Sequence, residues 1–278
     1  MIQKKYYLTN RDLYNYGKEK SIILVYGNWL AIKNMELSGK TAIVTGGNTG
    51  LGKNIAKELA KAGVNVVINY AFGSAEDIVS EIRNSGGKAI AIKADISSIV
   101  EVNNMVKEAV KEYGTIHFLI NNAGTTCKVP FGNIEELEDA DWDNIFAVNL
   151  KGAFNCIQAV IPFMKENSGS SIINIGSTAG TTGIGSSIPY AVSKGAIHCL
   201  TKSLANILAP DIRVNCLSPG PMETEWWSGR EEYIAKISAS LPMKRLVQPQ
   251  EVTDTILALL QIEAFTGQIV SPNCGRII

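Results

Sequence analysis

Thr45-Gly46-Gly47-Asn48-Thr49-Gly50-Leu51-Gly52 is the stretch of this chain that decides its fold. It follows a run rich in β-branched residues, Thr41–Thr45, and leads into a helical pattern over Gly50–Ala62. Glycines in such a turn allow positive φ and close approach of the backbone to a ligand, and the helix N-terminus offers free N–H groups to a phosphate. The turn therefore predicts a site for the pyrophosphate of a dinucleotide, although the same glycines could also serve only as a tight strand–helix connection.

The chain from Met35 onward alternates short β-rich runs with longer helical ones. The runs expected to form strands are mostly apolar on both faces, as in a parallel sheet covered by helices. They are Thr41–Thr45, Val64–Asn69, Lys88–Lys93, His117–Asn121, Ser170–Gly176, Ile212–Leu217 and Gln268–Ser271. The expected helices are Gly50–Ala62, Ala75–Asn84, Ile99–Tyr113, Asp141–Lys165, Tyr190–Leu208 and Glu251–Leu260. This alternation predicts an α/β fold: a single doubly wound Rossmann-type domain over residues 35–278, with a seven-stranded, mostly parallel sheet and helices on both faces.

Several polar or glycine-rich segments follow the ends of expected strands. They are the glycine turn, Asn121–Gly124, Ser177 and Pro219-Gly220. Ligands of doubly wound sheets bind outside the carboxyl ends of the strands, so we expect these segments to meet in one crevice. Pro221–Arg245 interrupts the alternation before the last strand, and we interpret it as a substrate-binding loop or lid.

The composition is that of an ordinary globular protein. Apolar residues make up 46% and charged residues 19%, and the formal net charge is +0, so nothing indicates a nucleic-acid partner. The five cysteines are scattered and form no CxxC motif, which favours a reducing compartment without a disulfide framework or a metal site. The longest apolar run near the start, Ile22–Ile32, is too short to span a bilayer. We therefore expect a cytoplasmic protein with no membrane partner.

Tyr190 and Lys194 lie four residues apart, so on a helix they share one face. An ammonium group beside a phenol favours the phenolate and lowers the pKa of the tyrosine, which makes acid–base chemistry near neutral pH accessible. Ser177, thirteen residues upstream at a strand end, can hydrogen-bond a substrate oxygen. A Tyr–Lys pair alone is common by chance, but with the glycine turn and Ser177 it predicts carbonyl reduction, or alcohol oxidation, with a nicotinamide cofactor.

From Met35 to its end the chain resembles the short-chain dehydrogenase/reductase family, and most of all its 3-oxoacyl-[acyl-carrier-protein] reductase branch. The matching elements stand in the family's order: TGGNTGLG at 45–52, Asp95-Ile96, NNAG at 121–124, Asn149, Ser177, YAVSK at 190–194, and Pro219-Gly220 with Thr224. One departure lies near the C-terminus. The family's usual Asn-Gly-Gly is here Pro272-Asn273-Cys274-Gly275, so the last turn is expected to differ.

The resemblance implies a role for each matching residue. Tyr190 would exchange the proton with the substrate, Lys194 would lower its pKa and bind the nicotinamide ribose, and Ser177 would orient the carbonyl. Asn149 would anchor a water that links Lys194 to solvent. The residues implied in cofactor binding, besides Tyr190 and Lys194, are Gly46, Asn48, Thr49, Gly50, Leu51, Asp95, Ile96, Asn122, Ala123, Pro219, Gly220, Met222 and Thr224, and no metal is implied.

The choice of cofactor depends on the end of the second expected strand. NAD-dependent members usually carry an acidic residue where this chain has Tyr70, so a 2′-phosphate meets no repulsion there. Thr49 and Ala71, however, stand where a basic residue is often found. We expect NADP(H) over NAD(H), with hydrogen bonds from Asn48 and Ser74 to the phosphate.

The substrate is expected to be a small molecule or an acyl thioester, with a 3-oxoacyl thioester favoured and a sugar, polyol or other small ketone as the alternative. A non-catalytic dinucleotide-binding sensor is disfavoured because Asn149, Ser177, Tyr190 and Lys194 are all present. An epimerase or dehydratase of the larger related fold is disfavoured as well, because such proteins usually have a longer C-terminal domain. In the family, helices equivalent to Asp141–Lys165 and Tyr190–Leu208 pair between subunits, so we expect a homotetramer, or at least a dimer.

Residues 1–34 have no counterpart in the family pattern. They hold six basic against two acidic residues, a net charge of +4, and show no sustained helical or strand period. One interpretation is a misassigned start, with Met35 as the native first residue and the extension poorly ordered. The other is an arm that docks on the remainder of the chain, whose net charge is −4, or on a partner. We favour the first, because terminal segments not tied into a sheet are usually poorly ordered.

Overall fold

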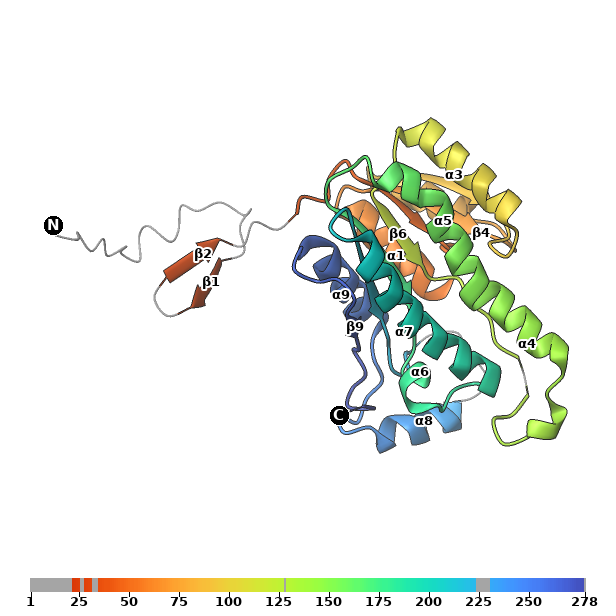
Figure 1. The fold of residues 1–278 in the computed structure, drawn as a ribbon. Coiled ribbons are helices and arrows are strands. Elements are labelled where there is room, and N and C mark those ends of the chain that lie inside the picture. The colour runs from red at the N-terminus through yellow and green to blue at the C-terminus, as the bar shows by residue number, and fades with distance from the viewer. Residues whose placement is uncertain (1–21, 26–27, 32–34, 128, 224–230, 278) are drawn as a thin grey trace. The chain divides into compact units, whose positions relative to one another are not determined.

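The computed structural model of the protein describes residues 22–25, 28–31, 35–127, 129–223 and 231–277 (Figure 1). The chain divides into two compact units, Met1–Met35 and Glu36–Ile278. In the first unit, strands β1 (Ile22–Val25) and β2 (Asn28–Ala31) pair antiparallel. Each strand has four residues, which is compatible with a sequence that shows no sustained strand period. A run of four residues is too short to show a period.

The second unit is built on one seven-stranded sheet. Its strand order is β5-β4-β3-β6-β7-β8-β9, and every neighbouring pair is parallel. The strands are β3 (Thr41–Val44), β4 (Asn65–Tyr70), β5 (Lys88–Lys93), β6 (Phe118–Asn121), β7 (Ser170–Ile175), β8 (Ile212–Leu217) and β9 (Ile269–Val270). The order reverses between β3 and β6, and this is the place where a doubly wound sheet opens a crevice for a ligand.

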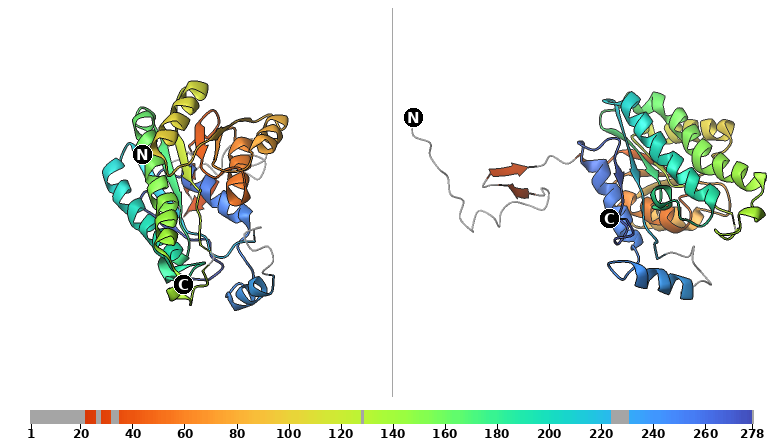
Figure 2. Two further views of the ribbon diagram at one scale, coloured as in Figure 1. Left: turned by 90° about the vertical axis from the view of Figure 1, so that its right-hand side faces the viewer. Right: turned by 60° about the horizontal axis from the view of Figure 1, so that its bottom comes forward.

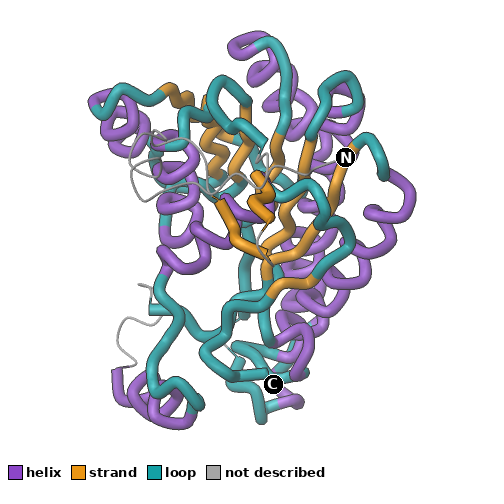
Figure 3. Tube along the Cα trace, turned by 90° about the vertical axis from the view of Figure 1, so that its left-hand side faces the viewer, coloured by secondary structure: helices purple, strands orange, loops and turns teal. Residues whose placement is uncertain are grey.

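Helices cover both faces of this sheet, as Figures 2 and 3 show. They are α1 (Gly50–Lys61), α2 (Glu76–Asn84), α3 (Ile99–Tyr113), α4 (Asp139–Phe146), α5 (Ala153–Met164), α7 (Ile188–Leu208) and α9 (Pro249–Gln261). Helices α3, α5 and α7 share one buried cluster with the sheet, in which Met105, Ile157 and Leu204 pack against Ile43 and Leu119. Helix α1 contacts α2 and α9 on the other face. The predicted doubly wound fold is confirmed.

Each predicted strand agrees with the structure to within one residue at each end. The prediction for Pro221–Arg245 was incomplete, because α8 (Glu231–Ser240) lies inside the expected loop. This ten-residue helix is only weakly amphipathic, so its sequence carries little periodic signal. A short helix after β7, α6 (Ala179–Thr182), was also missed.

The predicted helix Asp141–Lys165 is interrupted in the structure. Between α4 and α5 lies η3 (Ala147–Gly152), a π turn. The combined segment Asp139–Met164 is long and apolar enough to cross a membrane by length and composition alone. Within the described residues it lies against the sheet, with Cys156, Ile157 and Val160 fully buried in the core, and core helices commonly pass the same test.

Candidate active site

The glycine turn is fastened to the neighbouring strand end by a set of short hydrogen bonds. The Thr45 Oγ1 atom accepts from the backbone N–H groups of Asn122 and Ala123, each at 3.0 Å. In return, Asn122 Nδ2 donates to the carbonyl oxygens of Thr45 at 2.9 Å and Gly46 at 3.1 Å. These contacts join β3 and β6 where the strand order reverses. Sequence reasoning assigned no role to Thr45.

The turn itself has the geometry of a phosphate cradle. Gly46 and Gly50 have φ of +59° and +50°, values that residues other than glycine rarely adopt. A Cβ on Gly52 would lie 2.6 Å from Asn122 Nδ2, so the helix start needs glycine there. Helix α1 has no side-chain cap and no acidic residue in its first turn. Its free N–H groups and the positive end of its dipole therefore fit a pyrophosphate.

The end of β4 differs from our expectation at one point. Asn48 Nδ2 donates to the carbonyl oxygens of Phe72 at 2.9 Å and Ser74 at 3.4 Å, and the Ser74 hydroxyl accepts from the Glu76 N–H at 3.2 Å. The Asn48 amide group therefore has partners within the protein already, whereas the Ser74 hydroxyl only accepts there and keeps its own proton to donate. Their contacts fix the loop that carries Phe72, whose side chain is 85% exposed at the edge of the cleft.

The predicted residues meet in one cleft of about 1090 Å³. The predicted members that line it are Gly46, Asn48, Thr49, Gly50, Leu51, Asp95, Ile96, Asn122, Ala123, Ser177, Tyr190, Lys194, Pro219, Gly220 and Met222. Asn149 lies behind the lining, and Thr224 lies outside the described residues. The strand ends that were expected to converge therefore meet at this cleft.

The start of α7 positions Tyr190. The Ser187 hydroxyl caps the helix by accepting from the Tyr190 N–H at 3.3 Å, and Pro189 stands in the first turn, where its missing N–H costs nothing. The phenol lies near the Ser177 hydroxyl, which follows β7 and opposes the effect of burial on the pKa of the phenol. The Ser177 oxygen in turn accepts from the Ala179 N–H at 3.1 Å. A helix start and a strand end thus bring the two hydroxyl groups together.

Lys194 is buried one turn further along α7, with 4% of its surface exposed. Its Nζ atom donates to the Ile175 carbonyl at 2.8 Å and lies 5.7 Å from the centre of the Tyr190 ring. Burial lowers the pKa of Lys194 from 10.5 to about 8. The side chain therefore carries its ammonium at neutral pH, although little water surrounds it.

The predicted lowering of the Tyr190 pKa is not what this structure shows. Burial raises the pKa of Tyr190 above 10, and only its hydrogen bond with Ser177 opposes the shift. The ammonium of Lys194 is turned toward the Ile175 carbonyl, so desolvation of the phenolate is the larger effect. In the free protein the phenol therefore holds its proton.

Asn149 stands in the π turn, and its amide is fully used. Its Oδ1 accepts from the Thr125 N–H at 2.7 Å, and its Nδ2 donates to the Thr125 carbonyl and the Ser193 hydroxyl, both at 3.0 Å. The Ser193 hydroxyl donates to the Tyr190 carbonyl at 2.8 Å. π turns are frequent at functional sites. Here the turn lets one side chain hold the loop after β6 against the helix that carries Tyr190.

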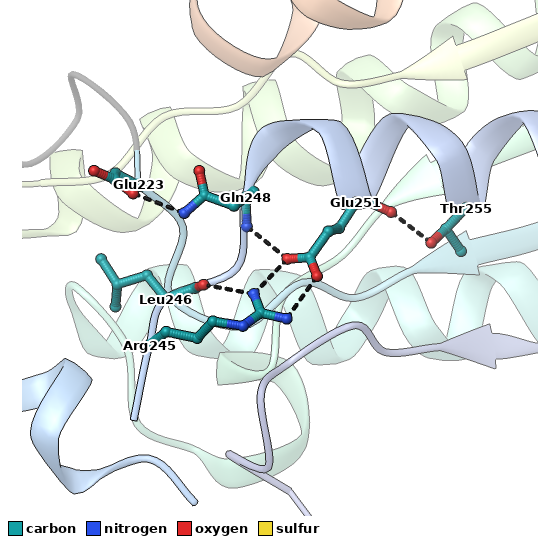
Figure 4. Close-up of polar contacts among 6 residues, drawn as sticks. All are labelled: Glu223, Arg245, Leu246, Gln248, Glu251 and Thr255. Carbon is teal, nitrogen blue, oxygen red and sulfur yellow. Dashed lines mark hydrogen bonds and ion pairs between the residues drawn. The ribbon is translucent and has the colours of Figure 1, made fainter. Parts of the chain in front are cut away.

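An ion pair fixes the start of α9, just after the segment expected to form a substrate loop (Figure 4). Arg245 donates to both carboxylate oxygens of Glu251 at 2.7 Å. The same carboxylate accepts from the Gln248 N–H at 2.9 Å, which completes a capping box. The pair is two-fifths exposed, so its contribution is chiefly geometric: it fixes where the segment that begins at Pro221 rejoins the core.

Comparison with known proteins agrees with this geometry. The sequence model of the short chain dehydrogenase family matches residues 40–234. A 3-oxoacyl-[acyl-carrier-protein] reductase of Staphylococcus aureus is 35% identical over 242 residues, which cover 85% of this chain and 97% of that one. A short-chain dehydrogenase/reductase from Serratia marcescens has a TM-score of 0.81 and 34% identity, over 87% of this chain and 99% of that one. A short chain dehydrogenase from Burkholderia cenocepacia, solved with NADP, has a TM-score of 0.79 and 28% identity over the same shares.

The chain therefore belongs to the short-chain dehydrogenase/reductase family of oxidoreductases, whose members use NAD or NADP. Its relatives include 3-oxoacyl-[acyl-carrier-protein] reductases at about 35% identity over most of the chain.

Proposed function

We propose that the protein interconverts a ketone and a secondary alcohol, with Tyr190 as the acid and base. The observation that carries the proposal is the meeting of Ser177, Tyr190 and Lys194 at the wall of the cleft that the glycine turn also lines. When bound, the nicotinamide supplies or accepts the hydride. A dinucleotide-binding sensor would need neither the phenol nor its buried ammonium partner.

In the reducing direction, each of the protein's own groups has a separate role. The phenol of Tyr190, kept protonated by burial, gives its proton to the carbonyl oxygen. The Ser177 hydroxyl donates a hydrogen bond to the same oxygen and stabilises its developing charge. The ammonium of Lys194 stabilises the phenolate left behind and holds the nicotinamide ribose. Asn149 fixes Thr125 and α7, and it would anchor a water that links Lys194 to solvent.

Tyr190→Phe tests this assignment. The variant should lose nearly all turnover and keep its affinity for the cofactor, because only the hydroxyl is removed. Lys194→Ala should lose both. A Tyr190→Phe enzyme with more than about a tenth of the wild-type kcat would have lost under about 1.4 kcal/mol of barrier stabilisation and would refute the role.

For the substrate we propose a 3-oxoacyl thioester, with a sugar, polyol or other small ketone as the alternative. The support is the S. aureus reductase, which the chain matches over 97% of that protein's length. The test is spectrophotometric: NADPH oxidation with acetoacetyl thioesters, simple ketones and keto sugars, and NADP⁺ reduction with polyols. Faster turnover of a polyol or sugar than of any thioester would favour the alternative.

For the cofactor we propose NADP(H) over NAD(H). The support is the lack of an acidic side chain at Tyr70 and Ala71, where a carboxylate would repel a 2′-phosphate, together with the NADP bound by the B. cenocepacia relative. Because the Asn48 amide is engaged elsewhere, the Ser74 hydroxyl and backbone N–H groups of the loop after β4 would hold the phosphate. A kcat/KM that favours NADH would overturn the choice.

We further propose a cytoplasmic homotetramer. Helices α5 and α7 carry exposed apolar side chains, among them Phe154 and Val192, which are 38% and 46% exposed. A hollow of about 620 Å³ lies on α4 and η3 and reaches α5 and α7, lined by Asp143, Phe146, Ala147, Leu150, Lys151, Phe154 and Leu200. Apolar faces of this kind are typical of subunit contacts. A monomer by light scattering at micromolar concentration would contradict this part of the proposal.

A further inference from the structure

The cleft has a second cation besides Lys194, and no role has been given to it. The charged side chains among its described lining are Asp95, Lys194 and Arg276. Asp95 flanks the expected adenine end, where its carboxylate is held by the Ser97 N–H and hydroxyl at 2.9 and 2.8 Å. Arg276 belongs to the C-terminal turn after β9, far along the chain from every other charged group of the site.

The C-terminal turn lies against the nicotinamide end of the cleft. The Gly220 N–H donates to the Pro272 carbonyl at 2.9 Å, and a Cβ on Gly220 would lie 2.9 Å from Asn273 Cα. The turn also meets the loop after α8, because the Met243 N–H donates to the Cys274 carbonyl at 3.2 Å. Figure 1 shows the C-terminus at the same end of the molecule as α8.

The turn is also rigid, so it presents Arg276 from a fixed backbone. Asn273 Oδ1 accepts from the Gly275 N–H at 2.8 Å, and the Asn273 carbonyl accepts from the Arg276 N–H at 3.0 Å. Cys274 and Gly275 have φ of +52° and +88°. The departure noted in the sequence, Cys274 in place of a glycine, is thus a residue held in the left-handed region.

The cleft that Arg276 lines is also lined by large apolar side chains. Among them are Phe131, Ile184, Met222 and Ile237. Within the described part of the chain, no carboxylate pairs with the Arg276 guanidinium, whereas Arg245 has Glu251. A guanidinium among apolar groups is strongly favoured to bind a carboxylate or phosphate, which it matches with paired N–H donors.

We propose that Arg276 binds a negatively charged oxygen group of the substrate, so that the preferred ketone carries a carboxylate or a phosphate beside an apolar segment. The inference rests on the proposed ketone reduction at the same cleft. It goes beyond it by assigning the substrate's charge and the residue that recognises it. A neutral small ketone or an uncharged sugar is disfavoured by the same argument.

The test compares pairs of ketones in which only one member carries the anionic group. Acetoacetate and methyl acetoacetate differ in a free carboxylate, and the acetoacetyl thioesters of 4′-phosphopantetheine and pantetheine differ in one phosphate. Arg276→Met should lower kcat/KM about tenfold or more for the charged member of the pair that Arg276 recognises, as expected for a lost charge-assisted hydrogen bond. It should change the neutral member less than about twofold, and Arg276→Lys should restore part of the loss. The pair that responds shows whether Arg276 recognises a carboxylate or a phosphate.

Lys236→Met is the matched control, since Lys236 is an exposed cation on α8 outside the cleft lining. It should leave both pairs unchanged. Equal losses for charged and neutral ketones, or no loss for either, would overturn the proposal. A weaker NADPH affinity in Arg276→Met would also overturn it, because the residue would then serve the cofactor.

A binding measurement separates this proposal from ketone reduction itself. Butyrate, butyl phosphate and butanol would be titrated calorimetrically into the enzyme with NADP⁺. Tighter binding of one anion than of butanol, lost about tenfold or more in Arg276→Met, would support the anion site even if no ketone is turned over. Binding that is equal for all three, or equal in both proteins, would refute it.

Discussion

Lys194→Met should change how the stability of the cofactor-free protein depends on pH. The folded protein lowers the pKa of Lys194 from 10.5 to about 8 by burial. At about 1.36 kcal/mol for each pKa unit, burial destabilises the ammonium form of Lys194 in the folded protein by about 3 kcal/mol. Between pH 8 and 10.5 the unfolded chain holds more protons than the folded one, so the free energy of unfolding of the wild type rises with pH. Below about pH 8 Lys194 is protonated in both states, so the full cost of burying the ammonium lowers the free energy of unfolding.

The variant removes this titration and keeps a side chain of similar length. Urea unfolding of both proteins between pH 7 and 10 should show the wild type gaining about 2–3 kcal/mol relative to Lys194→Met. The difference between the proteins is the readout, because Tyr190 and the other titrating groups are common to both. Lys202→Met, at an exposed position on the same helix, should show no such gain. Parallel pH profiles for wild type and Lys194→Met would refute the reasoning that burial sets the protonation of this lysine.

Four further outcomes are expected. A chain that begins at Met35 should equal the full-length protein in Tm, assembly and kcat/KM; a drop of several degrees would mean that the preceding segment packs on the fold. Gly52→Ala should weaken NADPH binding at least about tenfold by calorimetry, because its Cβ would displace Asn122 Nδ2, and unchanged affinity would contradict the tight turn. Asn149→Ala should cost about 2–4 kcal/mol in urea unfolding, since three hydrogen bonds are lost, one of them buried and two partly buried, and a cost under about 1 kcal/mol would contradict its role. Phe154→Glu should shift light-scattering mass toward smaller species if α5 lies in a subunit contact, and an unchanged mass would place the contact elsewhere.

The strands and the cleft could be predicted because they depend on local signals. Apolar runs bounded by glycine and asparagine mark buried parallel strands, and a ligand site follows from where those strands end. The sequence could not show which hydrogen bonds those ends make. Thr45 and Asn122 are ordinary turn residues until the sheet places them side by side.

Other features were missed because they arise from competition between interactions. The amide of Asn48 binds the loop after β4 instead of remaining free for a ligand. Burial determines the direction in which the pKa of Tyr190 shifts, because the Lys194 ammonium is hydrogen-bonded to the Ile175 carbonyl. Helix α8 is too weakly patterned to be told from a loop. Arg276 is one basic residue near the C-terminus, and only the return of the turn to Gly220 brings it to the cleft.

The π turn has a consequence for which insertions and deletions this protein can accept. A π turn holds one residue more than a regular helix would over the same length, and each residue of an α-helix advances the side-chain direction by about 100°. Removing one residue between Ala147 and Gly152 would leave a regular helix with α4 and α5 still in phase, but the side chains inside the segment would turn by about that angle. Val148 would leave the cleft wall, and Asn149 would lose its contacts with Thr125 and Ser193. The number of residues in this segment is therefore constrained as firmly as the identity of Asn149.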